Sequence, residues 1–130
     1  MGKKTLLIVA LFLIITPVLG IHTATAQVAP VSVQIASPMN GATVAGPDVT
    51  FTFMVAGLML APGEIGMPPV PGHGHMHIFL DGLFKGTVGT ATFTLMGVAP
   101  GMHTVRVDLH ENNHVPISPV VESSVMFTVV

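Results

Sequence analysis

Short runs of alternating apolar and polar residues, separated by glycine and proline, constrain this chain more than any other feature. In the run 49–55, valine and phenylalanine alternate with threonine and methionine. A period of two is that of a β-strand with one buried face. No window after residue 27 keeps the 3.6-residue period of an amphipathic helix. The pattern predicts strands at residues 31–35, 49–55, 75–81, 83–88, 91–95, 102–110 and 120–130.

About seven short strands with turn residues between them, in about 100 residues, are typical of an immunoglobulin-like Greek-key β-sandwich. We therefore expect an all-β fold with one hydrophobic core. One connection, residues 57–74, contains four prolines and shows no strand pattern. A loop of this length in a compact domain is usually functional or mobile.

The N-terminal segment has the anatomy of a secretory signal peptide. Two lysines among the first four residues precede an unbroken run of ten apolar residues at 6–15, and Pro17 follows it. The small residues Ala-Thr-Ala at 24–26 form a suitable cleavage site. The alternative is a transmembrane helix, but a bilayer span needs about 20 apolar residues.

We therefore predict a signal peptide at residues 1–26 and one Ig-like domain at 27–130. Cleavage after Gly20 is an alternative that would leave His22 second in the mature chain. Either cut predicts export to the periplasm or the extracellular space.

Composition excludes several classes of function. Only 8% of the residues are charged and the net charge is −2, so the chain lacks the cations that neutralise nucleic-acid phosphates. The absence of cysteine excludes disulfides, thiolate catalysis and cysteine-ligated metals. No phosphate-binding loop and no nucleophile elbow are present. We therefore predict a protein that is not an enzyme and binds no nucleic acid.

Histidine is unusually frequent, and the predicted fold gathers most of it at one end. In this sandwich the third strand pairs antiparallel with the sixth, so the start of 75–81 lies beside the end of 102–110. Strand alternation turns the apolar residues of 75–81 toward the core. The opposite, outward face is predicted to carry His75, His77, Asp108 and His110, with His73 and His114 on adjoining loops.

His103 belongs to a different environment. It has the parity of the core-facing residues and comes directly after Pro100-Gly101. Sandwich domains often hold a corner tyrosine near the start of this strand, bonded to nearby backbone. We predict that His103 has a structural role of that kind.

The histidine cluster predicts a metal site. Neutral imidazole is the commonest transition-metal ligand, and copper(II) heads the divalent affinity order for nitrogen sites. We expect copper, with zinc as the second choice, bound by His75 and His77 with help from His110 or His114; His73 is a further candidate ligand. Register is the critical step, because a slip of one residue would turn the second strand's ligands to the other face.

Two alternatives stay open on the sequence. Met59 and Met67, in the long loop, are candidate thioether ligands for copper. The histidines could instead be incidental to a cell-surface structural or interaction domain, which the low charge and high apolar content favour. In that case the partner would be a membrane or another exported protein rather than a metal ion.

Three segments resemble known exported domains. Residues 37–44 resemble the opening of bacterial Ig-like domains, and Gly-His-Gly-His-Met-His-Ile-Phe-Leu-Asp-Gly at 72–82 resembles a GHxHxxxDG signature of such domains. The run at 99–105 and the segment around His114 resemble CopC, a family of periplasmic copper-binding proteins. This resemblance implies an Ig-like fold and copper binding. The chain departs from CopC in carrying Gln27 at the predicted mature N-terminus, where that family has histidine.

Overall fold

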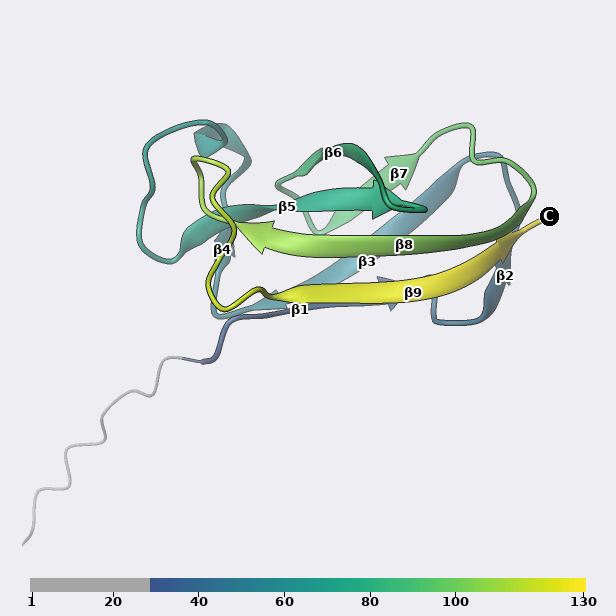
Figure 1. Ribbon diagram of the computed structural model, residues 1–130, viewed down its shortest axis with the longest axis horizontal. Coiled ribbons are helices and arrows are strands. Elements are labelled where there is room, and N and C mark those ends of the chain that lie inside the picture. Colours follow the sequence, from purple (N-terminus) through teal and green to yellow (C-terminus); the bar gives the residue numbers. More distant parts are fainter. Residues whose placement is uncertain (1–28) are drawn as a thin grey trace, which may run out of the picture.

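The computed structural model describes residues 29–130, which form an elongated sandwich of strands (Figure 1). The predicted signal peptide and both predicted cleavage sites lie outside the described residues. Within residues 29–130 no helix is long and apolar enough to cross a membrane.

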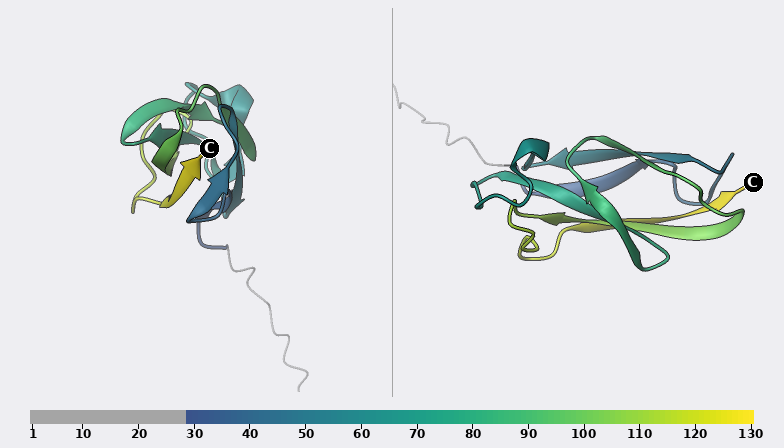
Figure 2. Two further views of the ribbon diagram at one scale, coloured as in Figure 1. Left: turned by 90° about the vertical axis from the view of Figure 1, so that its right-hand side faces the viewer. Right: turned by 90° about the horizontal axis from the view of Figure 1, so that it is seen from above.

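The strands form two sheets, which Figure 2 shows as two layers along the long axis of the molecule. The smaller sheet has the order β1-β3-β7. The larger follows the order β2-β9-β8-β5-β4, and β6 pairs antiparallel with β5 outside this path. The bounds are β1 Ser32–Ser37, β2 Ala42–Val44, β3 Val49–Ala56, β4 Met59–Leu60, β5 His73–Leu80, β6 Leu83–Val88, β7 Thr92–Leu95, β8 Gly101–His110 and β9 Glu122–Val129.

The core lies between the two sheets and follows from the alternation in the sequence. Phe51 and Phe53 of β3 are buried, whereas the intervening threonine is only partly buried. The Phe51 ring meets the Phe127 ring of β9 edge-on, with centroids 5.5 Å apart, and so joins the two sheets. The core also contains the buried residues Ile78, Leu80, Val105 and Val107, and Phe93 packs partly buried against it.

The fold is the immunoglobulin-like β-sandwich that the sequence predicts. The prediction missed two short strands, β2 and β4, and the short 3-10 helix η1 at Pro62–Glu64. The pairings of both strands explain why. β4 is two residues long and pairs in parallel with the first residues of β5, and β2 pairs in parallel with the end of β9. Such short elements are held by their neighbours and leave no periodic signal of their own.

Candidate metal centre

The predicted pairing of the third and sixth strands is confirmed. β5 and β8 run antiparallel, and His75 pairs with His110 while His77 pairs with Asp108. Met76 and Ile78, with the opposite parity, are fully buried in the core. His75, His77, Asp108 and His110 therefore share the outer face of the larger sheet, at one end of the molecule.

His75 lies on the outward face that the sequence predicts, but its side chain is fully buried, with an exposed fraction of 0%. The turn after β8 folds back over the sheet, held by hydrogen bonds from the Glu111 amide to the Val115 carbonyl and from the His114 amide to the Glu111 carbonyl. The ring of His114 comes to lie edge-on to that of His75, with centroids 4.7 Å apart. His75 is thus on the outer face but beneath a loop.

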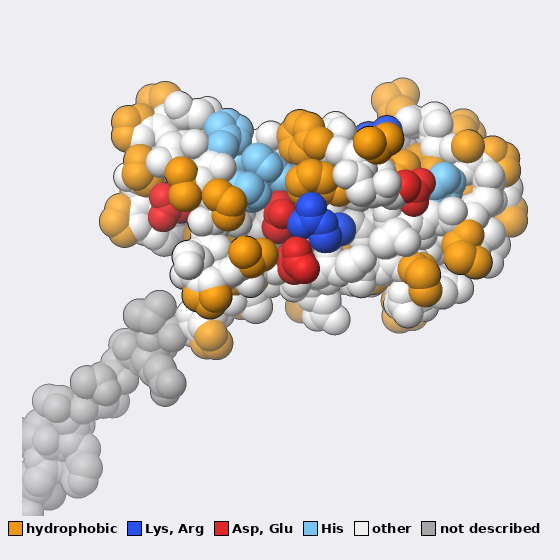
Figure 3. Space-filling view, viewed as in Figure 1, with side chains coloured by type: hydrophobic (Ala, Val, Ile, Leu, Met, Phe, Trp, Pro, Cys, Tyr) orange, Lys and Arg blue, Asp and Glu red, His pale blue; other side chains and the backbone are white. Residues whose placement is uncertain are grey.

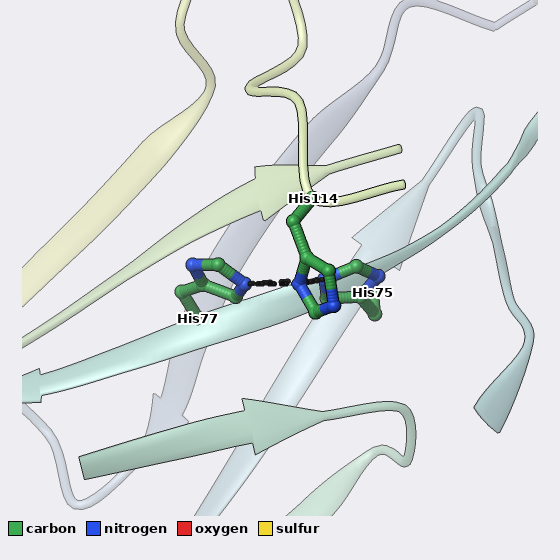
Figure 4. A group of neighbouring side chains, drawn as sticks. All are labelled: His75, His77 and His114. Atoms are coloured by element: carbon green, nitrogen blue, oxygen red, sulfur yellow. Dashed lines mark hydrogen bonds between the residues drawn. The ribbon is translucent and has the colours of Figure 1, made fainter. Parts of the chain in front are cut away.

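Three imidazole nitrogens converge at this point (Figure 4). Nε2 of His75 lies 3.2 Å from Nε2 of His77 and 3.1 Å from Nδ1 of His114. Nε2 of His77 also lies 3.1 Å from Nδ1 of His114. Each hydrogen bond needs one N–H and one lone pair, and three atoms in a triangle cannot be divided so that every pair has both. At least one of these contacts therefore joins two donors or two lone pairs and is not a hydrogen bond, and a cation facing three lone pairs removes the conflict.

Burial and the neighbouring histidines keep His75 and the half-buried His77 neutral at neutral pH. Burial, reinforced by His77, His114 and His110, lowers the pKa of His75 from 6.5 to about 4. Burial and His110 also lower the pKa of His77, against an opposing effect of Asp108. Neutral imidazole is the form that binds metals. At neutral pH these two side chains are therefore in the ligating form without losing a proton.

His110, a predicted ligand, lies beside the triangle and not in it. Its Nε2 is 3.0 Å from Oδ1 of Asp108 and its Nδ1 is 3.0 Å from the carbonyl oxygen of His114. Its ring stacks on that of His77, with centroids 3.7 Å apart. His110 therefore contacts two of the converging histidines and holds the backbone of His114, whose φ of 67° lies in the left-handed region.

Asp108 belongs to a chain of ion pairs that supports His110. Arg106 donates to Oδ2 of Asp108 at 2.6 Å and to Glu122 at 3.1 Å, and its guanidinium lies 4.0 Å from the centroid of the Phe79 ring. His77, Asp108 and His110 also lie close enough to form a second group of possible ligands. The polar atoms of Asp108 and His110 already have partners, however, whereas within residues 29–130 the three nitrogens of the triangle have no hydrogen-bond partner besides one another.

His73, the fifth predicted ligand, is bound elsewhere. Its Nδ1 lies 2.8 Å from Oε2 of Glu64, and that oxygen also accepts a hydrogen bond from Asn112 at 2.9 Å. The hydrogen bond with His73 is the main cause of a lowered pKa at Glu64. This network ties the long loop to the turn that carries His114. Sequence reasoning missed the role of the fully buried Asn112, because an asparagine in a turn carries no periodic signal.

His103 occupies the structural position that the sequence predicts. Its Nδ1 is 2.7 Å from Oδ2 of Asp81 and its Nε2 is 2.8 Å from the carbonyl oxygen of Ala99. The hydrogen bonds with Asp81 and Ala99 raise the pKa of His103. Oδ1 of Asp81 accepts the Thr104 amide at 2.8 Å, so the pair joins the end of β5 to the start of β8.

Comparison with known proteins identifies the fold. No family model and no curated protein matches the chain. The fibronectin(III)-like modules of CbhA from Clostridium thermocellum align over 76% of this chain and 46% of theirs, with 14% identity and a TM-score of 0.53. An engineered protein aligns over 80% of this chain and 21% of its own, with 17% identity and a TM-score of 0.52. The chain thus spans less than half the length of these structures.

CopC from Methylosinus trichosporium OB3b is also among the structural neighbours. It aligns over 77% of this chain and 93% of its own, with 19% identity and a TM-score of 0.41. A likeness this weak carries no inference about the site. Only the side-chain geometry of this chain supports the candidate metal centre.

Proposed function

We propose that this protein is an exported module that binds one transition-metal ion, copper before zinc, through His75, His77 and His114. The observation that carries the proposal is the triangle of nitrogens 3.1–3.2 Å apart. Two of its members are buried enough to stay neutral at physiological pH. The third, His114, is exposed and comes from a loop, so an ion can reach the site from solvent.

The donor set favours copper. It consists of imidazoles without a thiolate, and imidazole suits both copper and zinc. Copper(II) stands above zinc in the divalent affinity order, so we expect it to displace zinc in vitro. Binding of this kind would serve metal storage, delivery or tolerance, and we propose a binding module rather than an enzyme.

Export is part of the proposal. The signal-like residues 1–26 and the resemblance of residues 72–82 to exported Ig-like domains both favour a periplasmic or extracellular protein. The metal-binding domain would then be residues 27–130. The intact mass of the exported protein tests this, because a mass that retains Lys3 and Lys4 would indicate an uncleaved membrane anchor.

A cell-surface structural or interaction domain remains the competing function. Its support is the number of large apolar side chains left exposed, among them Met96 at 79% and Met102 at 74%. Size-exclusion chromatography separates the two functions. A monomer that takes up one metal ion supports metal binding, whereas oligomers indifferent to metal support the structural function.

Calorimetric copper titration of the purified protein, with electron paramagnetic resonance of the loaded form, tests the proposed site. We expect one copper(II) ion per chain with nitrogen ligands. The double variant His77→Ala, His114→Ala should lose binding and keep its fold, because neither side chain is fully buried. His103→Ala is the matched control and should bind copper like the parent. Copper binding by the double variant equal to that of the parent would place the site elsewhere.

A further inference from the structure

The triangle of nitrogens also fixes how many ligands this chain can give the ion. An imidazole nitrogen binds a first-row ion such as zinc at about 2.0–2.1 Å. The centre of a triangle with edges of 3.1–3.2 Å lies only about 1.8 Å from each corner, so an ion bonded at that length sits about 1 Å out of the plane. The three nitrogen–metal–nitrogen angles are then about 100°, close to those of a tetrahedron with one corner vacant.

The described residues do not fill that corner with a histidine or a carboxylate. The group within residues 29–130 that contains His75 and His114 has only His77 as its third member. Asp108, which shares the second possible ligand group with His77, is paired with Arg106 and His110. Glu64 is likewise bound to His73 and Asn112.

The site is also open to solvent on one side. His114 is exposed and His77 is half-buried, and Figure 3 shows histidine side chains reaching the surface at this end of the molecule. The Phe84 ring, 54% exposed, lies edge-on to His77 with centroids 5.2 Å apart. A small molecule can therefore approach the ion along the exposed edge of the triangle without the core opening.

Charge decides which ligand the vacant corner prefers. Three neutral imidazoles leave the full double charge of a bound copper(II) or zinc ion uncompensated. Because His75 is fully buried, part of the ion's surroundings has a low dielectric constant, which strengthens its attraction for an anion. A neutral donor or solvent leaves the charge of the ion at two, whereas a singly charged oxygen or nitrogen donor lowers it to one.

We propose that the metal-loaded protein binds a small anion directly at the fourth coordination position of the ion, and that a carboxylate or a comparably small inorganic anion is its natural ligand class. This inference rests on the proposed function. The anion displaces solvent from the ion and no bond of the anion is broken. Coordination of this kind would let the site recognise an anionic ligand, or a carboxylate of another molecule, only when metal is present.

Anion titration of the copper(II)-loaded full-length protein tests the inference, with azide as the first probe and acetate as the second. We expect azide to bind one per copper, with a new charge-transfer absorption and a shifted electron paramagnetic resonance spectrum. Acetate should compete with azide for the same position if carboxylates belong to the ligand class. Competition by chloride but not by acetate would restrict the class to small inorganic anions and overturn the carboxylate assignment.

Two further results separate the failure of this inference from the failure of the proposed function. If copper binds one per chain and its spectra do not change with azide, the coordination sphere is closed and the inference is wrong, although metal binding stands. If azide binds only after Met59→Leu or Met67→Leu, a thioether occupies the fourth position and the inference is also wrong. If the parent takes up no copper, the proposed function itself fails. His103→Ala is the matched control and should give the parent's azide titration.

Discussion

The two ends of the larger sheet hold histidines in opposite chemical settings. At one end, the side-chain nitrogens of His75, His77 and His114 face one another at 3.1–3.2 Å. At the other end, both nitrogens of His103 face oxygen acceptors, a carboxylate and a backbone carbonyl. The pKa of His103 is raised by these acceptors, whereas that of His75 is lowered to about 4 by burial and by other histidines.

This difference separates a structural histidine from a candidate ligand. An imidazole whose nitrogens all have protein acceptors gains from protonation and has no lone pair to offer a metal. Imidazoles that face one another lose from protonation and present lone pairs to a common point. The partners of the nitrogens, and not the number of histidines nearby, therefore distinguish the two roles.

The hydrophobic core lies beneath both ends of the sheet, and a cavity in it should give the largest expected loss in the free energy of unfolding. Phe53 is 3% exposed and lies in the buried face of β3. Phe53→Ala should lower the free energy of unfolding by about 3–5 kcal/mol, measured by urea denaturation. Copper affinity of the folded fraction should not change, since Phe53 belongs to neither group of histidines. Phe84→Ala is the control on an exposed ring and should cost much less.

Weakening the residues that hold the histidine triangle in place should give the next largest effect, a loss of copper affinity. Asp108 holds His110, which holds the backbone of His114. Asp108→Asn keeps the size of the side chain but removes its charge and weakens its bonds to His110 and Arg106. Loss of a supporting residue of this kind typically lowers metal affinity by about 10–100-fold, and calorimetric titration with copper measures it. Asp48→Asn is the matched control, because the one side-chain bond of Asp48 among the described residues is with the exposed Gly97 amide. Equal affinities in the two variants would show that the ion-pair chain does not position the ligands.

The sequence could predict most of this fold and the end of the sheet at which the candidate site lies. The β5–β8 register, which brings His75, His77 and His110 to one face of the sheet, follows from period-two alternation and from the standard pairing of the sandwich. The apolar face of β5 sets that alternation, since a slip of one residue would expose Met76 and Ile78.

What the sequence could not predict is the path of the loops. It grouped His110 and His73 with the ligands, whereas the structure bonds them to Asp108 and Glu64. His114 enters the triangle because the turn after β8 reverses through a left-handed backbone conformation at that residue. Such a reversal depends on contacts between distant segments, among them the buried Asn112 and Glu64, and not on a local pattern.

At the end of the sheet that holds His103, the substitution His103→Ala should cause a smaller loss of folding stability. It removes the bonds to Asp81 and Ala99 but leaves Asp81 bonded to the Thr104 amide. We expect the free energy of unfolding to fall by about 1–2 kcal/mol, the range for a few hydrogen bonds, one of them charged. Chemical denaturation measures this loss, and copper titration of the same variant should match the parent. A variant that loses copper affinity without losing stability would reverse the roles assigned to the two ends.

The most direct test of the comparison is the pH dependence of the metal-free protein. The unfolded chain protonates His75 near its ordinary value of 6.5, but the folded protein does so only near 4. The unfolded state therefore binds more protons between these values, and stability falls as the pH drops below about 6.5. His103 has a raised pKa, so its contribution to stability is complete below pH 6.5 and is lost as the pH rises through the pKa of the folded state.

Urea denaturation from about pH 5 upward, where free carboxyl groups remain largely ionised, should show that stability declines on both sides of pH 6.5. His103→Ala should lose the alkaline decline and keep the acid one. If the variant keeps both declines, protonation of His103 does not cause the alkaline one. The two ends of the sheet then do not differ in how protonation affects stability.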